Sequence, residues 1–145
     1  MSIFSKTSEY AMRATFYIAK RSQEGHRSGI KEIAEQIDSP EHFLAKILQK
    51  LSKDGLIQSA KGPNGGFYLD NENFNRPLAD IVIAFEGEHI FTGCGMGLSY
   101  CSEENPCPLH NEFKTIRNKI TKMLRSTTIG QFNNELIKGQ LTLNK

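Results

Sequence analysis

Residues 30–69 read IKEIAEQIDSPEHFLAKILQKLSKDGLIQSAKGPNGGFYL, and their pattern is the strongest indication of the fold. Its first part has apolar residues at the three- and four-residue spacing of a helix over 30–37, which an Asp-Ser-Pro break then ends. The same spacing predicts a second helix over 40–54, with Ser39 as its N-cap, the proline in its first turn and Gly55 as its left-handed end. The apolar positions of these two predicted helices are Ile30, Ile33, Ala34, Ile37, Phe43, Leu44, Ile47, Leu48 and Leu51.

The end of this stretch predicts a β-hairpin. Leu56–Ala60 and Phe67–Leu69 have the character of short strands, and the Gly-Pro-Asn-Gly-Gly segment between them must turn. Upstream, the apolar spacing over residues 10–18 predicts one more helix. Helix, helix, turn, helix and hairpin in this order are typical of a winged helix-turn-helix, in which the last helix is positioned to enter the major groove of DNA.

Downstream of the hairpin the pattern changes. A turn to about residue 77 leads to a predicted helix over 78–85, the aperiodic segment 87–108 follows, and a long amphipathic helix is predicted over 109–124. From Gly130 onward the sequence is polar, so we expect it to fray, although three apolar side chains there are able to dock on the rest of the protein. These are Phe132, Leu136 and Ile137.

Composition and charge narrow the class of protein. The 145 residues are 38% hydrophobic. They contain no run of about 18 apolar residues such as a membrane span needs, and they begin without the residue order of a secretory signal, so we expect a cytoplasmic protein. The net charge of +2 is the sum of three unequal parts: +2 over residues 1–70 (ten Lys/Arg against eight Asp/Glu), −5 over 71–110 (one against six) and +5 over 111–145 (seven against two). All three cysteines lie in the acidic part, and their odd number argues against a disulfide scaffold and for metal or redox chemistry.

The predicted helix over 40–54 has a face suited to DNA. We expect Lys46, Lys50 and Lys61 to hold phosphates, while His42, Gln49 and the tip of the hairpin reach the grooves. A row of lysines is on many helices only a solvated face, and a glycine-rich tip is often only a turn. The order of the elements favours the DNA-binding interpretation over these alternatives. The candidate DNA contacts are Ser39, His42, Lys46, Gln49, Lys50, Lys61, Gly62, Asn64 and Gly65.

Three cysteines and a histidine follow in the pattern Cys94-x6-Cys101-x5-Cys107-x2-His110. Thiols this close in one loop can converge on one metal centre, and the absence of CxxC pairs favours an iron–sulfur cluster over a zinc ribbon. The fourth ligand would be His110, an acidic residue or a group from another chain. A thiol switch with one disulfide and inert, reduced cysteines remain alternatives. The sequence has no Ser/His/Asp order and no paired carboxylates of the kind that catalysis uses, so we do not expect an enzyme.

Taken together, several stretches resemble the Rrf-type family of bacterial winged-helix transcription regulators, which includes IscR-, NsrR- and CymR-like members. They are SKTSEYAMRATFYIA, IKEIAEQI, FLAKILQKLSKDGLI, AKGPNGGFYL and the cysteine loop that ends in CPLH, and the resemblance covers about residues 1–130. It implies a mainly α fold: a winged helix-turn-helix DNA-binding domain with a long C-terminal dimerisation helix. It further implies a homodimeric repressor that binds a near-palindromic DNA operator.

The resemblance also implies ligands for a cluster. Cys94, Cys101 and Cys107 match the cluster cysteines of the family, and His110 matches the histidine ligand of IscR-like members that hold a 2Fe–2S cluster. Glu9 aligns with the acidic residue that NsrR-like members supply across the dimer. A 2Fe–2S cluster is therefore favoured over 4Fe–4S, and such a cluster can be absent from purified protein.

Three further expectations concern the signal, the operator and the division of the chain. The regulator would sense redox, nitric oxide or iron–sulfur status; the alternative is a cluster-free member regulated by a thiol switch, a small molecule or a partner protein. Ala45 stands where IscR-like members have an acidic residue that tunes operator choice, so we expect a different operator. The chain would divide into a winged helix-turn-helix DNA-binding region (1–77), a cysteine loop with the dimerisation helix (78–130) and a C-terminal tail (131–145).

Overall fold

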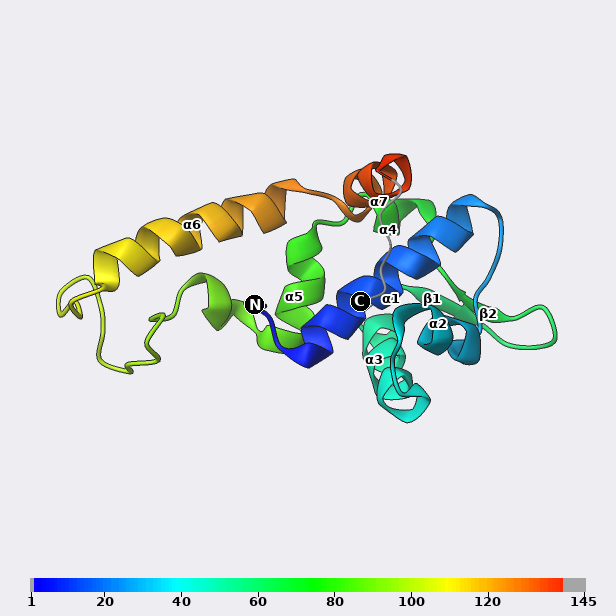
Figure 1. Ribbon diagram of the computed structural model, residues 1–145, viewed down its shortest axis with the longest axis horizontal. Helices are drawn as coiled ribbons and strands as arrows, with labels where there is room; N and C mark the ends of the chain where they lie inside the picture. Colours follow the sequence, from blue (N-terminus) through cyan, green and yellow to red (C-terminus); the bar gives the residue numbers. More distant parts are fainter. Residues whose placement is uncertain (1, 140–145) are drawn as a thin grey trace.

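The computed structural model describes residues 2–139, and Figure 1 shows a mainly helical molecule with one small hairpin. The mainly α winged-helix fold expected from the sequence is confirmed. No helix within the described residues is long and apolar enough to cross a membrane. The elements are α1 (Lys6–Gln23), α2 (Ile30–Ile37), α3 (Glu41–Lys53), β1 (Gln58–Ala60), β2 (Gly66–Tyr68), α4 (Asn71–Phe74), α5 (Leu78–Glu86), the 3-10 helix η1 (Glu88–Phe91), α6 (His110–Ser126) and α7 (Ile129–Lys138).

Helix α1 is the centre of the core. It presents Ala11, Ala14 and Ala19, all fully buried, so that neighbouring helices can approach its backbone closely. Helices α2, α3, α5 and α7 all pack against it. The apolar stripes of α2 and α3 pack against α1 and against each other. Their buried members match those predicted from the sequence, except that Ile30 and Phe43 are only partly buried.

The hairpin is short, and a backbone segment from outside it is hydrogen-bonded to one of its strands. Strands β1 and β2 pair antiparallel, with Gln58 opposite Tyr68 and Ala60 opposite Gly66. The segment between α1 and α2 adds a bridge, because Ser28 exchanges two backbone hydrogen bonds with Phe67, of 3.0 and 2.8 Å. Gly66 has a φ of +137°, and a Cβ there would lie 2.9–3.1 Å from the backbone of Ser28, so this crossing requires glycine.

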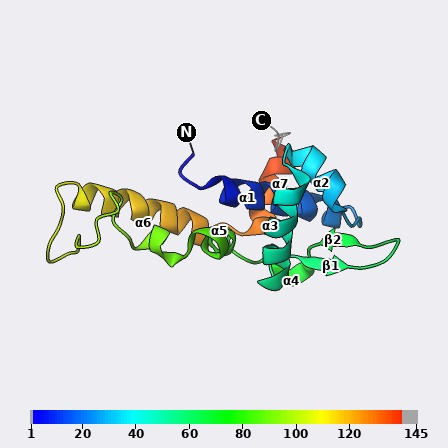
Figure 2. The same ribbon diagram turned by 90° about the horizontal axis from the view of Figure 1, so that it is seen from below.

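Helix α6 runs away from this helical body. Figures 1 and 2 both show the loop that follows η1 at the far end of α6, while the hairpin projects from the opposite end of the molecule. Among the described elements, α6 packs mainly on α5 and η1. Of its seventeen residues only Leu124 is buried. The loop is therefore placed by η1 and α6, at a distance from the winged helix-turn-helix.

Between the start of α3 and the cysteine loop, the structure differs from the sequence expectations at several places. Ser39 is not the N-cap of α3: Pro40 takes that position without a side-chain cap, and the Ser39 hydroxyl donates to the Pro40 carbonyl at 3.3 Å. The turn before α5 contains the four-residue helix α4, which a capping box at Asp70 stabilises. The segment 87–108, expected to lack regular structure, begins with η1.

The expectation that the chain frays from Gly130 was wrong for the described residues. They form α7, which starts with a capping box between Thr128 and Gln131 and packs on α1. Docking is confirmed for two of the three apolar side chains: Phe132 stacks on Phe16 with ring centroids 4.1 Å apart, and Leu136 is buried. Ile137 is exposed. The remaining part of the expected tail, 140–145, lies outside the described residues.

Candidate metal centre and nucleic-acid interface

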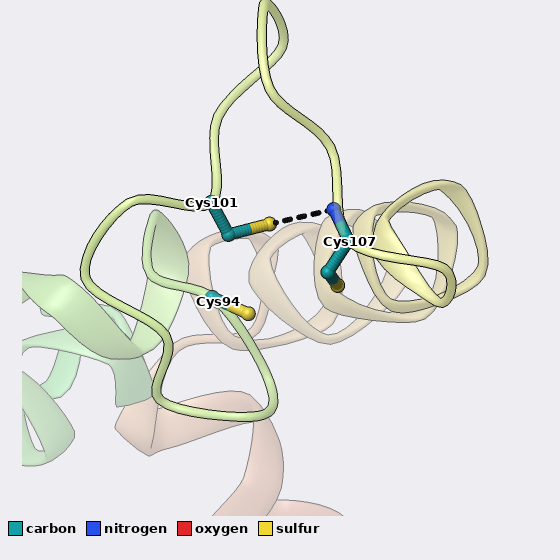
Figure 3. Close-up of side chains that lie close together, drawn as sticks. All are labelled: Cys94, Cys101 and Cys107. Carbon is teal, nitrogen blue, oxygen red and sulfur yellow. Dashed lines mark hydrogen bonds between the residues drawn. The ribbon is translucent and has the colours of Figure 1, made fainter.

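The three cysteines converge although no regular element connects them. The Sγ atoms of Cys94, Cys101 and Cys107 all lie within 4.8 Å of one another, and each residue is half-buried. Figure 3 shows the three side chains pointing into the space enclosed by the loop. Within residues 2–139, this is the one group of three or more Cys, His, Asp or Glu side chains close enough to hold a metal ion.

Backbone amides face two of the thiols. The Cys107 amide donates to Cys101 Sγ at 3.3 Å, and amides of Leu98 and Met96 donate to the Cys94 sulfur, which lowers the pKa of Cys94. At Cys101 the amide of Cys107 acts in the same direction, but burial and the neighbouring thiols outweigh it and raise the pKa of Cys101. The loop thus stabilises a thiolate at its first cysteine, while three thiolates together call for a cation to offset their charge.

His110, the first residue of α6, lies beside the thiols. Its Nδ1 is 3.2 Å from Cys101 Sγ, and its side chain is only 10% exposed. The other ring nitrogen faces the Glu103 carboxylate at 3.3 Å, and hydrogen bonds from Lys114 and His110 lower the pKa of Glu103. His110 is not among the groups that all lie within 4.8 Å of one another, so it contacts one edge of the thiol triad.

Glu9 lies elsewhere. It is in the first turn of α1, where it forms an ion pair with Lys6 at 3.0 Å, and hydrogen bonds from Ser2 and Lys6 lower its pKa. It is not part of the thiol group of its own chain. The structure contains one chain, so a contribution of Glu9 from a second copy stays a prediction.

The base of the cysteine loop is fixed by a residue that sequence analysis did not single out. Arg117 of α6 donates from a terminal guanidinium nitrogen to the Gly93 carbonyl at 2.6 Å, directly before Cys94. Its Nε is buried without a hydrogen-bond partner in the described structure. Beside it lies a mostly apolar cavity of about 430 Å³, lined among others by Cys94, Phe113 and Ile120. No periodicity marks Arg117, because its role depends on a contact across 24 residues.

The candidate DNA contacts lie just before α3, along α3 and at the hairpin tip. His42, Lys46, Gln49 and Lys50 are all exposed on α3, as expected from the sequence, and Lys50 forms an ion pair with Asp54 at 3.0 Å. At the hairpin tip Lys61, Gly62 and Asn64 are exposed and Gly65 is half-buried; Ser39 is also half-buried.

The exposed face of α3 and the hairpin also meet in a groove. Gln49 lines a depression of about 350 Å³ together with Ala45, Ser59 and Phe67. The structure thus brings Gln49 to the junction of α3 and the hairpin. Whether these residues touch DNA stays a prediction.

Comparisons with known proteins find relatives over most of the chain. The protein-family model Rrf2, described as “Iron-dependent Transcriptional regulator”, matches residues 4–135. A putative HTH-type transcriptional regulator of Aquifex aeolicus is 35% identical over 129 residues, which are 88% of each chain. The regulator IscR of Pectobacterium atrosepticum is 29% identical over 135 residues, 93% of this chain and 79% of that protein.

Two solved structures show the same fold. CymR of B. subtilis, the global cysteine regulator, has a TM-score of 0.76 at 24% identity and covers 93% of this chain and 98% of its own. IscR of T. potens has a TM-score of 0.75 at 22% identity, with 98% and 93% covered.

Proposed function

Because this chain belongs to the Rrf2 family of DNA-binding transcriptional regulators, and so to a family of regulators rather than enzymes, we propose that it is a homodimeric repressor controlled by an iron–sulfur cluster. The cluster would be held by Cys94, Cys101 and Cys107. The repressor would act in the cytoplasm, where bacterial DNA is, and respond to redox, nitric oxide or iron–sulfur status.

The observation that carries the cluster proposal is the mutual approach of the three sulfurs to within 4.8 Å. Three thiolates held this close together need a cation or a cluster to offset their charge. Thiolates are the ligands of iron–sulfur clusters, so the chemistry of the donors fits such a group.

The chain's own residues have distinct parts in this proposal. A bound cluster would supply iron that exchanges electrons or reacts with a diatomic gas. Cys94, Cys101 and Cys107 hold it, and the amide of Cys107 stabilises the charge on Cys101. His110, 3.2 Å from Cys101 Sγ, is placed to become the fourth ligand by a small change of its side chain, which favours a 2Fe–2S centre of the IscR-like kind. Glu9 of a second copy is the alternative fourth ligand.

The exposed face of α6 supports a homodimer. Ile116 and Met123 are 54% and 52% exposed on a helix that buries only Leu124 within its own chain. Apolar side chains along a helix with little cover are suited to packing against the same helix of a second copy. In such a dimer the two α3 helices face successive major grooves, about one helical turn apart.

The proposed DNA contacts follow the two exposed elements. Lys46, Lys50 and Lys61 bind phosphates, while His42 and Gln49 reach base edges and the hairpin tip approaches the minor groove. Ser39 and the tip residues Gly62, Asn64 and Gly65 complete the set. Figures 1 and 2 show the cysteine loop at the far end of α6 from the winged helix-turn-helix, so in this proposal the cluster alters DNA binding through α6 and η1.

Anaerobic purification and reconstitution, followed by absorption spectroscopy and iron and sulfide analysis, test the cluster. We expect visible absorbance with iron and sulfide in equal amounts, about two of each per chain for 2Fe–2S. Replacing each cysteine with serine should abolish the absorbance. Colourless protein with negligible iron after reconstitution would contradict the cluster and leave DNA binding untouched.

Two further variants identify the fourth ligand. His110→Ala or Glu9→Ala should change the cluster spectrum, whereas the matched changes His26→Ala and Glu24→Ala, at exposed positions away from the thiols, should not. If neither His110→Ala nor Glu9→Ala changes it, both candidate ligands are wrong.

The same proximity of the thiols supports one alternative, a cluster-free thiol switch. Sulfurs within 4.8 Å can form a disulfide after modest movement. Iron-free protein whose DNA affinity changes when a mild oxidant removes two titratable thiols would select this alternative. A small molecule or a partner protein would be indicated if neither iron nor thiol state altered DNA affinity.

A further inference from the structure

A positively charged side chain from outside the hairpin lies at the hairpin tip. Arg27 belongs to the segment between α1 and α2. The amide and the carbonyl of its neighbour Ser28 both form hydrogen bonds with the backbone of Phe67 in β2. The Arg27 guanidinium carbon is 4.9 Å from the centre of the Tyr68 ring, and a terminal nitrogen donates to the Asn64 carbonyl at 3.3 Å. The cationic group is therefore held where the hairpin turns, 37 residues away in sequence.

The charge of Arg27 is available for a partner. Arg27 is exposed, and within residues 2–139 it forms none of the ion pairs of the structure. Between Asp54 and Asp70 the chain contains no acidic residue, so Arg27 and Lys61 give the hairpin an unopposed positive charge. A guanidinium has five N–H donors, of which the Asn64 carbonyl takes one.

We propose that Arg27 is a DNA-contacting residue that binds a backbone phosphate beside the hairpin tip. The proposal rests on DNA binding by this family and is independent of the cluster. The aromatic ring and the Asn64 carbonyl fix the side chain before DNA arrives, which lowers the entropy lost on binding. The planar fork of arginine can hold the carbonyl and a phosphate oxygen at once, whereas the ammonium of lysine cannot reproduce this geometry.

The test is the salt dependence of binding to a fluorescein-labelled duplex of about 30 base pairs and arbitrary sequence, measured by anisotropy between about 0.05 and 0.2 M salt. Each lost phosphate contact reduces the slope of log K against log salt by about 0.9. Arg27→Ala should reduce it by this amount for each protomer bound. The same relation gives a loss of affinity of about eightfold per protomer at about 0.1 M salt.

Two variants separate a phosphate contact from other effects. Arg27→Lys keeps the charge, so it should preserve the slope while binding more weakly than wild type. Lys138→Ala removes one charge from α7, which packs on the opposite side of α1 from α3, and should leave slope and affinity unchanged. Circular dichroism and urea unfolding confirm that each variant is folded.

The outcomes distinguish this proposal from DNA binding itself. Wild-type protein that does not bind the duplex would contradict DNA binding and with it the role of Arg27. Wild-type protein that binds, together with an Arg27→Ala variant of unchanged slope, would overturn only the phosphate contact. In that case any loss of affinity comes from a displaced hairpin tip.

Discussion

Glu86 connects the start of α1 to the end of α5, the helix that leads into the cysteine loop. Its Oε1 accepts a hydrogen bond from the Ser5 amide at 2.7 Å and one from the Ser8 hydroxyl at 2.8 Å. Ser5 is the N-cap of α1, and Ser8 is fully buried. Replacing Glu86 with alanine should therefore destabilise the whole winged helix-turn-helix and not only its surface.

The size of this effect follows from the two contacts. Hydrogen bonds to a charged group contribute about 1.5–3 kcal/mol each, and because Glu86 is half-buried we take a total of about 2–3 kcal/mol for Glu86→Ala. With a urea dependence of about 2 kcal/mol/M, the unfolding midpoint should fall by about 1–1.5 M. Glu86→Gln keeps an acceptor oxygen without the charge and should cost about 1 kcal/mol.

The stabilisation should also depend on pH. Burial alone would raise the pKa of Glu86, but the hydrogen bonds from Ser5 and Ser8 outweigh it and lower the pKa below its usual 4.5. A carboxyl with a lowered folded-state pKa stabilises the fold above its unfolded pKa, and this stabilisation is lost as pH falls through the folded value. The difference between wild type and Glu86→Gln should thus be constant from about pH 7 to pH 5 and shrink in more acidic solution.

Urea unfolding followed by circular dichroism at neutral and acidic pH measures both effects. Glu88→Ala is the matched control, because Glu88 lies two residues away and its 3.7 Å ion pair with Arg125 is exposed on both sides. It should change the free energy of unfolding by less than about 0.5 kcal/mol. Equal unfolding midpoints for Glu86→Ala and Glu88→Ala, or a difference between wild type and Glu86→Gln that persists in acid, would show that the Glu86 hydrogen bonds do not stabilise the fold.

Three further changes test the hairpin, the C-terminal helix and the cysteine loop. Gly66→Ser should destabilise the fold by about 2 kcal/mol or more and weaken duplex binding, because its Cβ would meet the backbone of the α1–α2 segment at positive φ. Gly29→Ser, in open space at the N-cap of α2, should leave the free energy of unfolding unchanged. Equal losses of stability in Gly66→Ser and Gly29→Ser would contradict this explanation. Phe132→Ala should lower the free energy of unfolding by about 3 kcal/mol through loss of its ring stack on α1, against less than about 1 kcal/mol for the exposed Ile137→Ala; equal thermal shifts would mean that α7 does not stabilise the fold. Arg117→Leu removes the hydrogen bond to the Gly93 carbonyl, directly before Cys94, and should speed iron release to a chelator about tenfold. An unchanged rate of release would show that the cysteine loop keeps its shape without Arg117.

Local sequence patterns closely predicted the winged helix-turn-helix part of the fold. The helix predicted over 30–37 has those bounds, because its apolar spacing is uninterrupted and Asp38 ends it in the left-handed conformation. Gly55 ends α3 with a φ of +72°, also as predicted. These features depend on neighbouring residues along the chain, so the sequence alone is enough to locate them.

Helix α7 shows why the rest was harder to predict. Its sequence is largely polar, and it packs on α1 partly through Phe132, which stacks on Phe16, a contact that no local pattern contains. One local signal was present: Thr128 and Gln131 have the spacing of a capping box, which marks a helix start. Using that signal would have placed a helix where fraying was expected.

The spacing of apolar residues was enough to predict the order of the main elements from α1 to α6, without α4 and η1, and the sequence also supplied the lysine face of α3 and the four candidate ligands between Cys94 and His110. Long-range packing was needed to show that the three sulfurs meet, that His110 contacts one of them and that Glu9 lies apart in its own chain. The same holds for Arg27 and Arg117, whose partners are 37 and 24 residues away. The physical reason is that a loop without periodicity takes its shape from long-range packing, here of η1 and α6, and such contacts leave no trace in the spacing of neighbouring residues.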